Sequence, residues 1–141
     1  AIENYDDKEI GKSVKIAIFL SILDVHRQWV PLDSKVIDTK YNSGKFSWAF
    51  MDKSSKHNEH TSIIFNDNSN TFKIKQIAGF VARRIVNLMN INSNVKRGGN
   101  LGFIKFGSRV EIIVPDNFKI KVKKGMKVKG CKTVIGRFNF S

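Results

Sequence analysis

The chain has 141 residues, of which 41% are hydrophobic, and this suits one globular domain with one core. A single cysteine, Cys131, excludes an internal disulfide, and no apolar run approaches the ~20 residues of a membrane-spanning helix. Residues 1–70 carry nine Lys/Arg and ten Asp/Glu, whereas residues 71–141 carry sixteen Lys/Arg and two acids, a net of +14. A C-terminal half with this positive charge is expected to attract nucleic acid or an anionic lipid surface. The alternative is that its lysines only keep exposed strand faces soluble.

Apolar runs and alternating patterns predict short strands along most of the chain. Residues 16–23 form an apolar run typical of a buried strand, and residues 71–74 alternate between apolar and polar side chains. In residues 76–89, apolar side chains at helical spacing compete with a central glycine and β-branched residues, which favour extended structure. Residues 105–114 are expected to form a strand that contains a Gly–Ser pair.

The C-terminal part continues the strand pattern. Residues 118–122 alternate between apolar and basic side chains, as in a half-buried strand. Residues 95–98 and 122–125 share a pattern before short apolar segments, similar to the hairpin repeat of biotinyl- and lipoyl-type barrels. Turn-forming residues recur at 42–44, 66–70, 92–94, 98–100 and 115–117. We therefore predict a mainly β (α+β) fold, a compact barrel- or sandwich-like single domain over residues 1–141.

The dipeptide Gly107–Ser108 offers specific chemistry. The serine hydroxyl can attack the preceding carbonyl and convert the amide into an ester. Elimination across the serine Cα–Cβ bond then releases the upstream chain, and the remaining dehydroalanine hydrolyses to a pyruvoyl group and ammonia. Glycine permits the close approach and the strained dihedrals that this needs. A Gly–Ser pair is also a common turn dipeptide, so Ser108 is equally compatible with an ordinary strand residue.

Five segments, in order, resemble the phosphatidylserine decarboxylase family, more closely its short bacterial and archaeal-type branch. They are IFLSILDVH (18–26), YNSGKF (41–46) followed by Asn58–Glu59, QIAGFVARRIV (76–86), GFIKFGSRV (102–110) and VKKGMKV (122–128). The resemblance implies a carboxy-lyase that converts phosphatidylserine to phosphatidylethanolamine and CO₂. It also implies self-cleavage between Gly107 and Ser108 into a larger chain, 1–107, and a pyruvoyl chain, 108–141, which stay associated.

The resemblance also assigns roles to particular residues. The cofactor would be a pyruvoyl group made from Ser108, and no metal is expected. His26 matches a functionally important histidine and suits proton transfer, and Asp24 would share its face of an extended strand. Apart from the resemblance, the guanidinium group of Arg83 or Arg84 suits the phosphate or carboxylate of such a substrate, and the pair is equally compatible with one salt-bridged and one solvated arginine. His57 and His60 are expected to be exposed turn residues and not metal ligands.

The implied partner is phosphatidylserine or a similar serine phospholipid, met peripherally at the cytoplasmic face of a membrane. The cleavage fragments would associate with each other, a homo-oligomer remains open, and no nucleic acid is expected.

Two departures from the family pattern keep alternatives open. Trp29 stands where longer members have a second histidine, and no Asp–Gly motif precedes residue 18, because Asp7 is followed by Lys8. One alternative is a truncated or inactive member that does not self-process. The other is a basic β-domain that binds nucleic acid by stacking aromatic side chains on bases. The candidate aromatic residues are Phe103, Phe106, Phe118 and Phe138.

Overall fold

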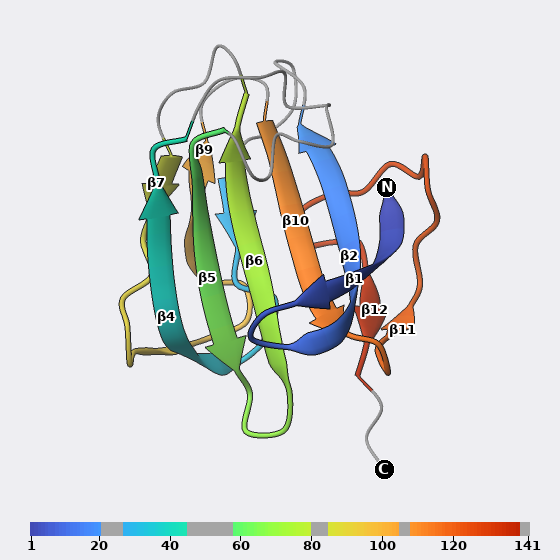
Figure 1. Ribbon diagram of the computed structural model, residues 1–141, viewed down its shortest axis with the longest axis horizontal. Coiled ribbons are helices and arrows are strands. Elements are labelled where there is room, and N and C mark those ends of the chain that lie inside the picture. Colours follow the sequence, from blue (N-terminus) through green and yellow to red (C-terminus); the bar gives the residue numbers. More distant parts are fainter. Residues whose placement is uncertain (21–26, 45–57, 80–84, 105–107, 139–141) are drawn as a thin grey trace.

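The computed structural model describes residues 1–20, 27–44, 58–79, 85–104 and 108–138. In these residues the chain forms twelve strands and no helix, and so none of them forms a helical membrane span. The strands form one large sheet and two small ones, with a second layer behind the large sheet in the view of Figure 1. The predicted mainly β, single-domain architecture is therefore confirmed.

The large sheet has seven antiparallel strands in the order β1-β2-β10-β6-β5-β4-β8. These strands are β1 (Ile2–Asp7), β2 (Gly11–Leu20), β10 (Ser108–Pro115), β6 (Thr71–Ala78), β5 (His60–Asn66), β4 (Ser34–Asn42) and β8 (Asn94–Val95). The C-terminal strand β10 thus lies inside the sheet, between β2 and β6. The strands predicted at 16–23, 71–74 and 105–114 are confirmed as far as the structure describes these ranges.

The small sheets supply the second layer. One has the order β3-β9-β7, built from β3 (Arg27–Trp29), β9 (Asn100–Ile104) and β7 (Ile85–Asn87). The other pairs β11 (Lys119–Ile120) with β12 (Gly136–Arg137). Within residues 76–89, the structure has strand at 76–78 and 85–87 and no helix in the described part, as expected from the glycine and the β-branched residues. Residues 80–84 lie outside the described residues.

The hydrophobic core fills the space between the layers. Phe65 of β5 and Phe72 of β6 are cross-strand partners whose rings stack with centroids 4.9 Å apart. Leu101 and Ile104 of β9 meet them from the second layer as members of the same buried cluster. Burial of each such side chain stabilises the fold by roughly 1.5–3 kcal/mol. These contacts hold the two layers together.

The lysine-rich C-terminal segment keeps the predicted alternation. Ile120 and Val122 are turned inward, and Lys119 and Lys121 are exposed. Strand pairing is shorter than predicted, because β12 offers a partner only along Gly136–Arg137.

The repeated pattern at 95–98 and 122–125 produces two similar turns. Gly98 and Gly125 have φ of 82° and 85°, and each turn is closed by a backbone hydrogen bond, Gly99 N to Lys96 O or Met126 N to Lys123 O. These are the features of a type II turn, which requires positive φ at its third residue. Only the first turn leads directly into a strand, β9. The predicted repeat is therefore found in the two turns but not in the strands that follow them.

Candidate active site at the polar end of the sandwich

Ser108 is the first residue of β10 and only 2% exposed. Its Cα partners are Leu20 of β2 and Ala78 of β6. Figure 1 shows β10 beginning, and β2 and β6 ending, at the upper end of the large sheet. Cross-strand partners share a face of the sheet, and Ala78 belongs to the core. The Ser108 side chain therefore faces the interior, between the two layers.

The strand register places two further parts of the chain next to Ser108, and each of them precedes a segment that contains predicted site residues. Leu20 directly precedes the segment 21–26, and Ala78 lies two residues before the segment 80–84. Both are direct partners of Ser108, so two separate parts of the chain converge on it. The remaining predicted site residues, Asp24, His26, Arg83, Arg84 and Gly107, lie outside the described residues.

The interior near Ser108 is polar, in contrast to the rest of the core. Gln28, Asn58, Thr61 and Gln76 are each less than a tenth exposed. Thr61 is the direct partner of Gln76, and Gln76 is in turn the partner of Val110, two residues after Ser108. Gln76 therefore lies diagonally across from Ser108 on the same face, at a Cβ separation of roughly 7 Å.

Gln76 connects the two layers at this end. Its Nε2 donates to Gln28 Oε1 at 2.9 Å and to the backbone oxygen of Val86 at 3.2 Å. Its Oε1 is buried and has no hydrogen-bond partner among the residues that the structure describes. Leaving such an acceptor unsatisfied costs about 1–3 kcal/mol, so the interior holds an oxygen suited to a donor from a bound molecule.

Gly102 makes this contact between the layers possible. Its φ is +155°, and a Cβ there would lie 2.0 Å from Val86 O and 2.9 Å from Gln76 Nε2. No side chain fits that space, so only glycine lets β9 approach the Gln76 amide. In the sequence, Gly102 stands out only as the first residue of the motif 102–110, because a spacing pattern gives no information about contacts across the layers.

Asn58 and its neighbours hold the strand end opposite Ser108. The Asn58 side-chain amide donates to Ala78 O at 2.7 Å, and Ala78 N donates to Glu59 O at 2.9 Å. The Glu59 carboxylate accepts a hydrogen bond from Tyr41, and this bond raises the pKa of the Tyr41 hydroxyl. Asn58–Glu59, known from the sequence only as part of a motif, therefore has a structural role beside the site.

The histidine prediction was partly wrong. His60 is half-buried in β5 and places Nδ1 2.8 Å from Asn58 O, so it is not an exposed turn residue. His57 lies outside the described residues. Within the described ranges, no group of three or more His, Cys, Asp or Glu side chains is arranged to hold a metal ion.

The opposite face of β10 carries buried charges. Arg109 donates a hydrogen bond to the Glu111 carboxylate, and Lys15 Nζ lies 3.9 Å from the same oxygen. Lys75 is the cross-strand partner of Glu111; burial lowers its pKa, although the carboxylate acts in the other direction. These side chains link β10 to β2 and β6 on the face away from Ser108, which fixes the strand that begins with the serine.

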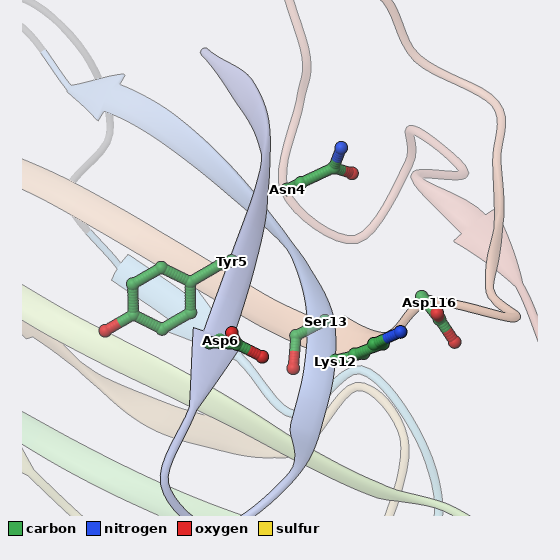
Figure 2. A pocket seen from close by; sticks show the side chains of 6 residues that line it. All are labelled: Asn4, Tyr5, Asp6, Lys12, Ser13 and Asp116. Atoms are coloured by element: carbon green, nitrogen blue, oxygen red, sulfur yellow. The ribbon is translucent and has the colours of Figure 1, made fainter.

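An open depression of about 420 Å³ lies at the other end of β10 and is shown in Figure 2. Ser13, which lines it, pairs with Pro115, which is seven residues and about 23 Å from Ser108 at roughly 3.3 Å per strand residue. Asp6 also lines the depression, and Asp7 accepts hydrogen bonds from the β1–β2 turn. Both aspartates therefore lie at the end of the sheet away from Ser108, and the depression is not the candidate site.

Trp29 has a packing role. It ends β3, and a Cβ on Gly130 would lie 2.0 Å from its Cζ3 atom. The indole ring therefore packs directly against the backbone of the lysine-rich segment. This contact accounts for a large aromatic residue where longer family members have a histidine.

The fold and site define a β-sandwich protein with a buried serine at the start of a central strand, at the polar end of the interior. The chain belongs to the phosphatidylserine decarboxylase family, since the family's sequence profile matches residues 2–136.

Curated relatives agree with this assignment. The chain is 38% identical over 138 residues to a phosphatidylserine decarboxylase proenzyme of Wolbachia pipientis, covering 97% of this chain and 59% of the relative. A proenzyme of the same name from Syntrophotalea carbinolica is 41% identical over 135 residues, 95% of this chain and 62% of the relative. A putative archaetidylserine decarboxylase proenzyme of Methanosarcina mazei is 39% identical over 121 residues, 86% of this chain and 58% of the relative. The chain thus spans about three fifths of the length of these relatives. No solved structure matches it.

Proposed function

We propose that this chain carries the self-cleaving, pyruvoyl-forming site of a decarboxylase acting on phosphatidylserine or a related serine phospholipid. The observation that carries the proposal is the position of Ser108, buried at the start of a central strand and diagonally across from Gln76 Oε1, a buried acceptor with no partner in the part of the chain that the structure describes. The names of the relatives, which include both phosphatidylserine and archaetidylserine decarboxylase proenzymes, support a serine phospholipid as the substrate class.

Self-cleavage would use the chain's own atoms. The Ser108 hydroxyl attacks the Gly107 carbonyl, and the peptide nitrogen leaves as an amine. Elimination then breaks the Cβ–O bond of the ester, so that Gly107 leaves as a carboxylate and residue 108 becomes dehydroalanine. Water adds to its tautomer, and ammonia leaves. Burial of Ser108 favours this course, because water reaching the ester early would release residues 1–107 and leave serine behind.

The residues around Ser108 fit a pyruvoyl group. This group supplies an electrophilic carbonyl that accepts electrons when CO₂ leaves the substrate. Pairing of β10 with β2 and β6 holds residue 108, and Gln76 Oε1 offers an acceptor for the substrate head group. Under the same proposal His26, supported by Asp24, transfers protons, and Arg83 or Arg84 binds the phosphate.

The intact mass under denaturing conditions tests self-cleavage. We expect two species, residues 1–107 and residues 108–141 with pyruvoyl in place of serine. Ser108→Ala should give one uncut species without decarboxylase activity. The matched control is Ser13→Ala, which removes another buried strand serine at the far end of the sheet and should be cut normally. An uncut wild-type chain, or activity in Ser108→Ala, would overturn the proposal.

A further inference from the structure

The segment from β11 to β12 presents a positively charged surface with no counterions of its own. Eight basic side chains are exposed there, and none forms an ion pair with any residue that the structure describes. The one acidic residue of the segment 116–137 is Asp116. This basic surface consists of Lys119, Lys121, Lys123, Lys124, Lys127, Lys129, Lys132 and Arg137.

The backbone register brings like charges together on this surface. Lys119 and Arg137 are direct cross-strand partners, and both are exposed. Lys121 follows on the same face, where its backbone N–H donates to Ile135 O at 2.8 Å. Like charges directly opposite each other destabilise a strand pair. An anion outside the chain would relieve this repulsion, so the arrangement itself favours a negatively charged partner.

Apolar side chains accompany the charges. Met126 and Val134 are each 55% exposed, and Met126 follows the turn formed by Lys123, Lys124 and Gly125. A combination of basic and exposed apolar side chains is typical of surfaces that lie at the interface of an anionic bilayer, where the apolar groups enter the boundary region.

Two of the four aromatic residues that could stack on nucleic-acid bases, Phe118 and Phe138, are engaged elsewhere, and Phe106 lies outside the described residues. Phe118 packs edge-to-face on Phe138 with ring centroids 5.1 Å apart, and Phe138 belongs to the buried core. Binding of single strands depends on exposed aromatic platforms. A bilayer therefore suits the basic surface better than a nucleic acid does.

We propose that the basic surface docks this protein on an anionic lipid bilayer. The choice of a bilayer rests on the proposed function in one respect, because phosphatidylserine is itself an anionic lipid. A membrane that contains the substrate would thus attract the surface. Gly130, packed on Trp29, anchors the lysine-rich segment to the second layer, so that docking would orient the whole sandwich.

Vesicle cosedimentation tests the proposal, with phosphatidylcholine vesicles that contain or lack phosphatidylserine. The triple variant K123Q/K124Q/K127Q removes three charges from the basic surface. The control K8Q/K35Q/K96Q removes three exposed lysines located elsewhere. Each lysine near an anionic membrane increases the binding constant roughly fivefold. We therefore expect the binding constant for vesicles with phosphatidylserine to fall on the order of 100-fold in the triple variant and to change little in the control. Wild-type binding should weaken as salt increases.

Three outcomes would overturn the docking proposal: equal losses in the two variants, equal binding to vesicles with and without phosphatidylserine, or a preference for an oligonucleotide over the vesicles. Binding by Ser108→Ala separates the two proposals, because that variant cannot form the pyruvoyl group but keeps the basic surface. If the wild-type chain is uncut yet binds anionic vesicles through Lys123, Lys124 and Lys127, docking stands and the proposed function fails.

Discussion

Gln76 shows how much of the candidate site depends on single contacts between the layers. Its donor group is used by Gln28 and Val86 on the second layer, whereas its acceptor Oε1, diagonally across from Ser108, has no hydrogen-bond partner among the described residues. A buried side chain with one end fixed and the other end available is well suited to hold a substrate group without moving.

Gln76→Met is therefore expected to separate substrate binding from self-cleavage. The substitution keeps the size of the side chain but removes the amide that donates to Gln28 Oε1 and Val86 O, and the loss of these two hydrogen bonds should lower the free energy of unfolding by about 2 kcal/mol. It also removes the free acceptor, so KM for the phospholipid should rise severalfold. Denaturant unfolding, intact mass and steady-state kinetics measure the three effects.

A folded Gln76→Met variant with unchanged KM would exclude Gln76 from substrate binding. The control is Thr61→Val, which changes the neighbouring buried residue on the same face and leaves the Gln76 hydrogen bonds intact. Its KM should stay at the wild-type value.

The site could be predicted from the sequence only where the chemistry is local. Gly107–Ser108 was found because self-cleavage needs two adjacent residues. Gln28 and Gln76 were missed because they are 48 residues apart and meet only through the packing of two sheets. No sequence pattern distinguishes such a pair of glutamines from solvated strand residues.

At the scale of elements, the β1–β2 hairpin is tied to the sheet by a buried ion pair. Lys73 Nζ of β6 lies 2.9 Å from Asp7 Oδ1 and 2.6 Å from Glu9 Oε2. Burial opposes the ionisation of Asp7, but hydrogen bonds from Lys73 and the turn hold its pKa below 3.8. Burial likewise opposes the charge on Lys73, but the two carboxylates raise its pKa above 10.5.

The ion pair predicts a defined dependence of stability on pH. Because the pKa of Asp7 is lowered by folding, its contribution is complete above 3.8 and is lost as the pH falls through the folded value. The raised pKa of Lys73 makes its contribution complete below 10.5 and lost at more alkaline pH. Asp7→Asn should lower the free energy of unfolding by about 3 kcal/mol or less at neutral pH, since Glu9 still pairs with Lys73. It should also reduce the acid limb, which is the fall in the free energy of unfolding as the pH decreases below neutral.

Denaturant unfolding from acid to neutral pH measures this effect. Glu3→Gln is the control, because Glu3 pairs with Lys15 but is largely exposed, and such pairs contribute about 0–1 kcal/mol. An acid limb as steep in Asp7→Asn as in the wild type would contradict the role of Asp7.

Elements were predictable where alternation or a turn residue determines the local conformation. The inward Ile120 and Val122 followed from period-two spacing, and the strand character of residues 76–78 and 85–87 followed from residue type. The length of β11 could not be predicted in this way, because it is determined by how much of β12 is available for pairing. Strand order was likewise out of reach, since β10 inserts between two strands distant in sequence.

At the scale of the whole molecule, the proposed cut would leave the sheet intact. The smaller fragment would keep β10, which pairs with β2 from Ser108↔Leu20 to Pro115↔Ser13 and also with β6. It would also contribute Phe138 to the core.

We therefore expect the two fragments to coelute in native gel filtration and to separate only when denatured. A preparation that is cut but loses residues 108–141 in native buffer would contradict this expectation. The uncut Ser108→Ala variant provides the reference elution volume.

The position of β10 in the middle of the sheet has a further consequence. An intact chain unfolds in a unimolecular step, so its stability does not depend on how much protein is present. Once the bond before β10 is cut, unfolding releases two molecules, and mass action enters the equilibrium. Each tenfold dilution would then remove about 1.4 kcal/mol, so maturation would turn a self-contained fold into an assembly whose persistence depends on its concentration.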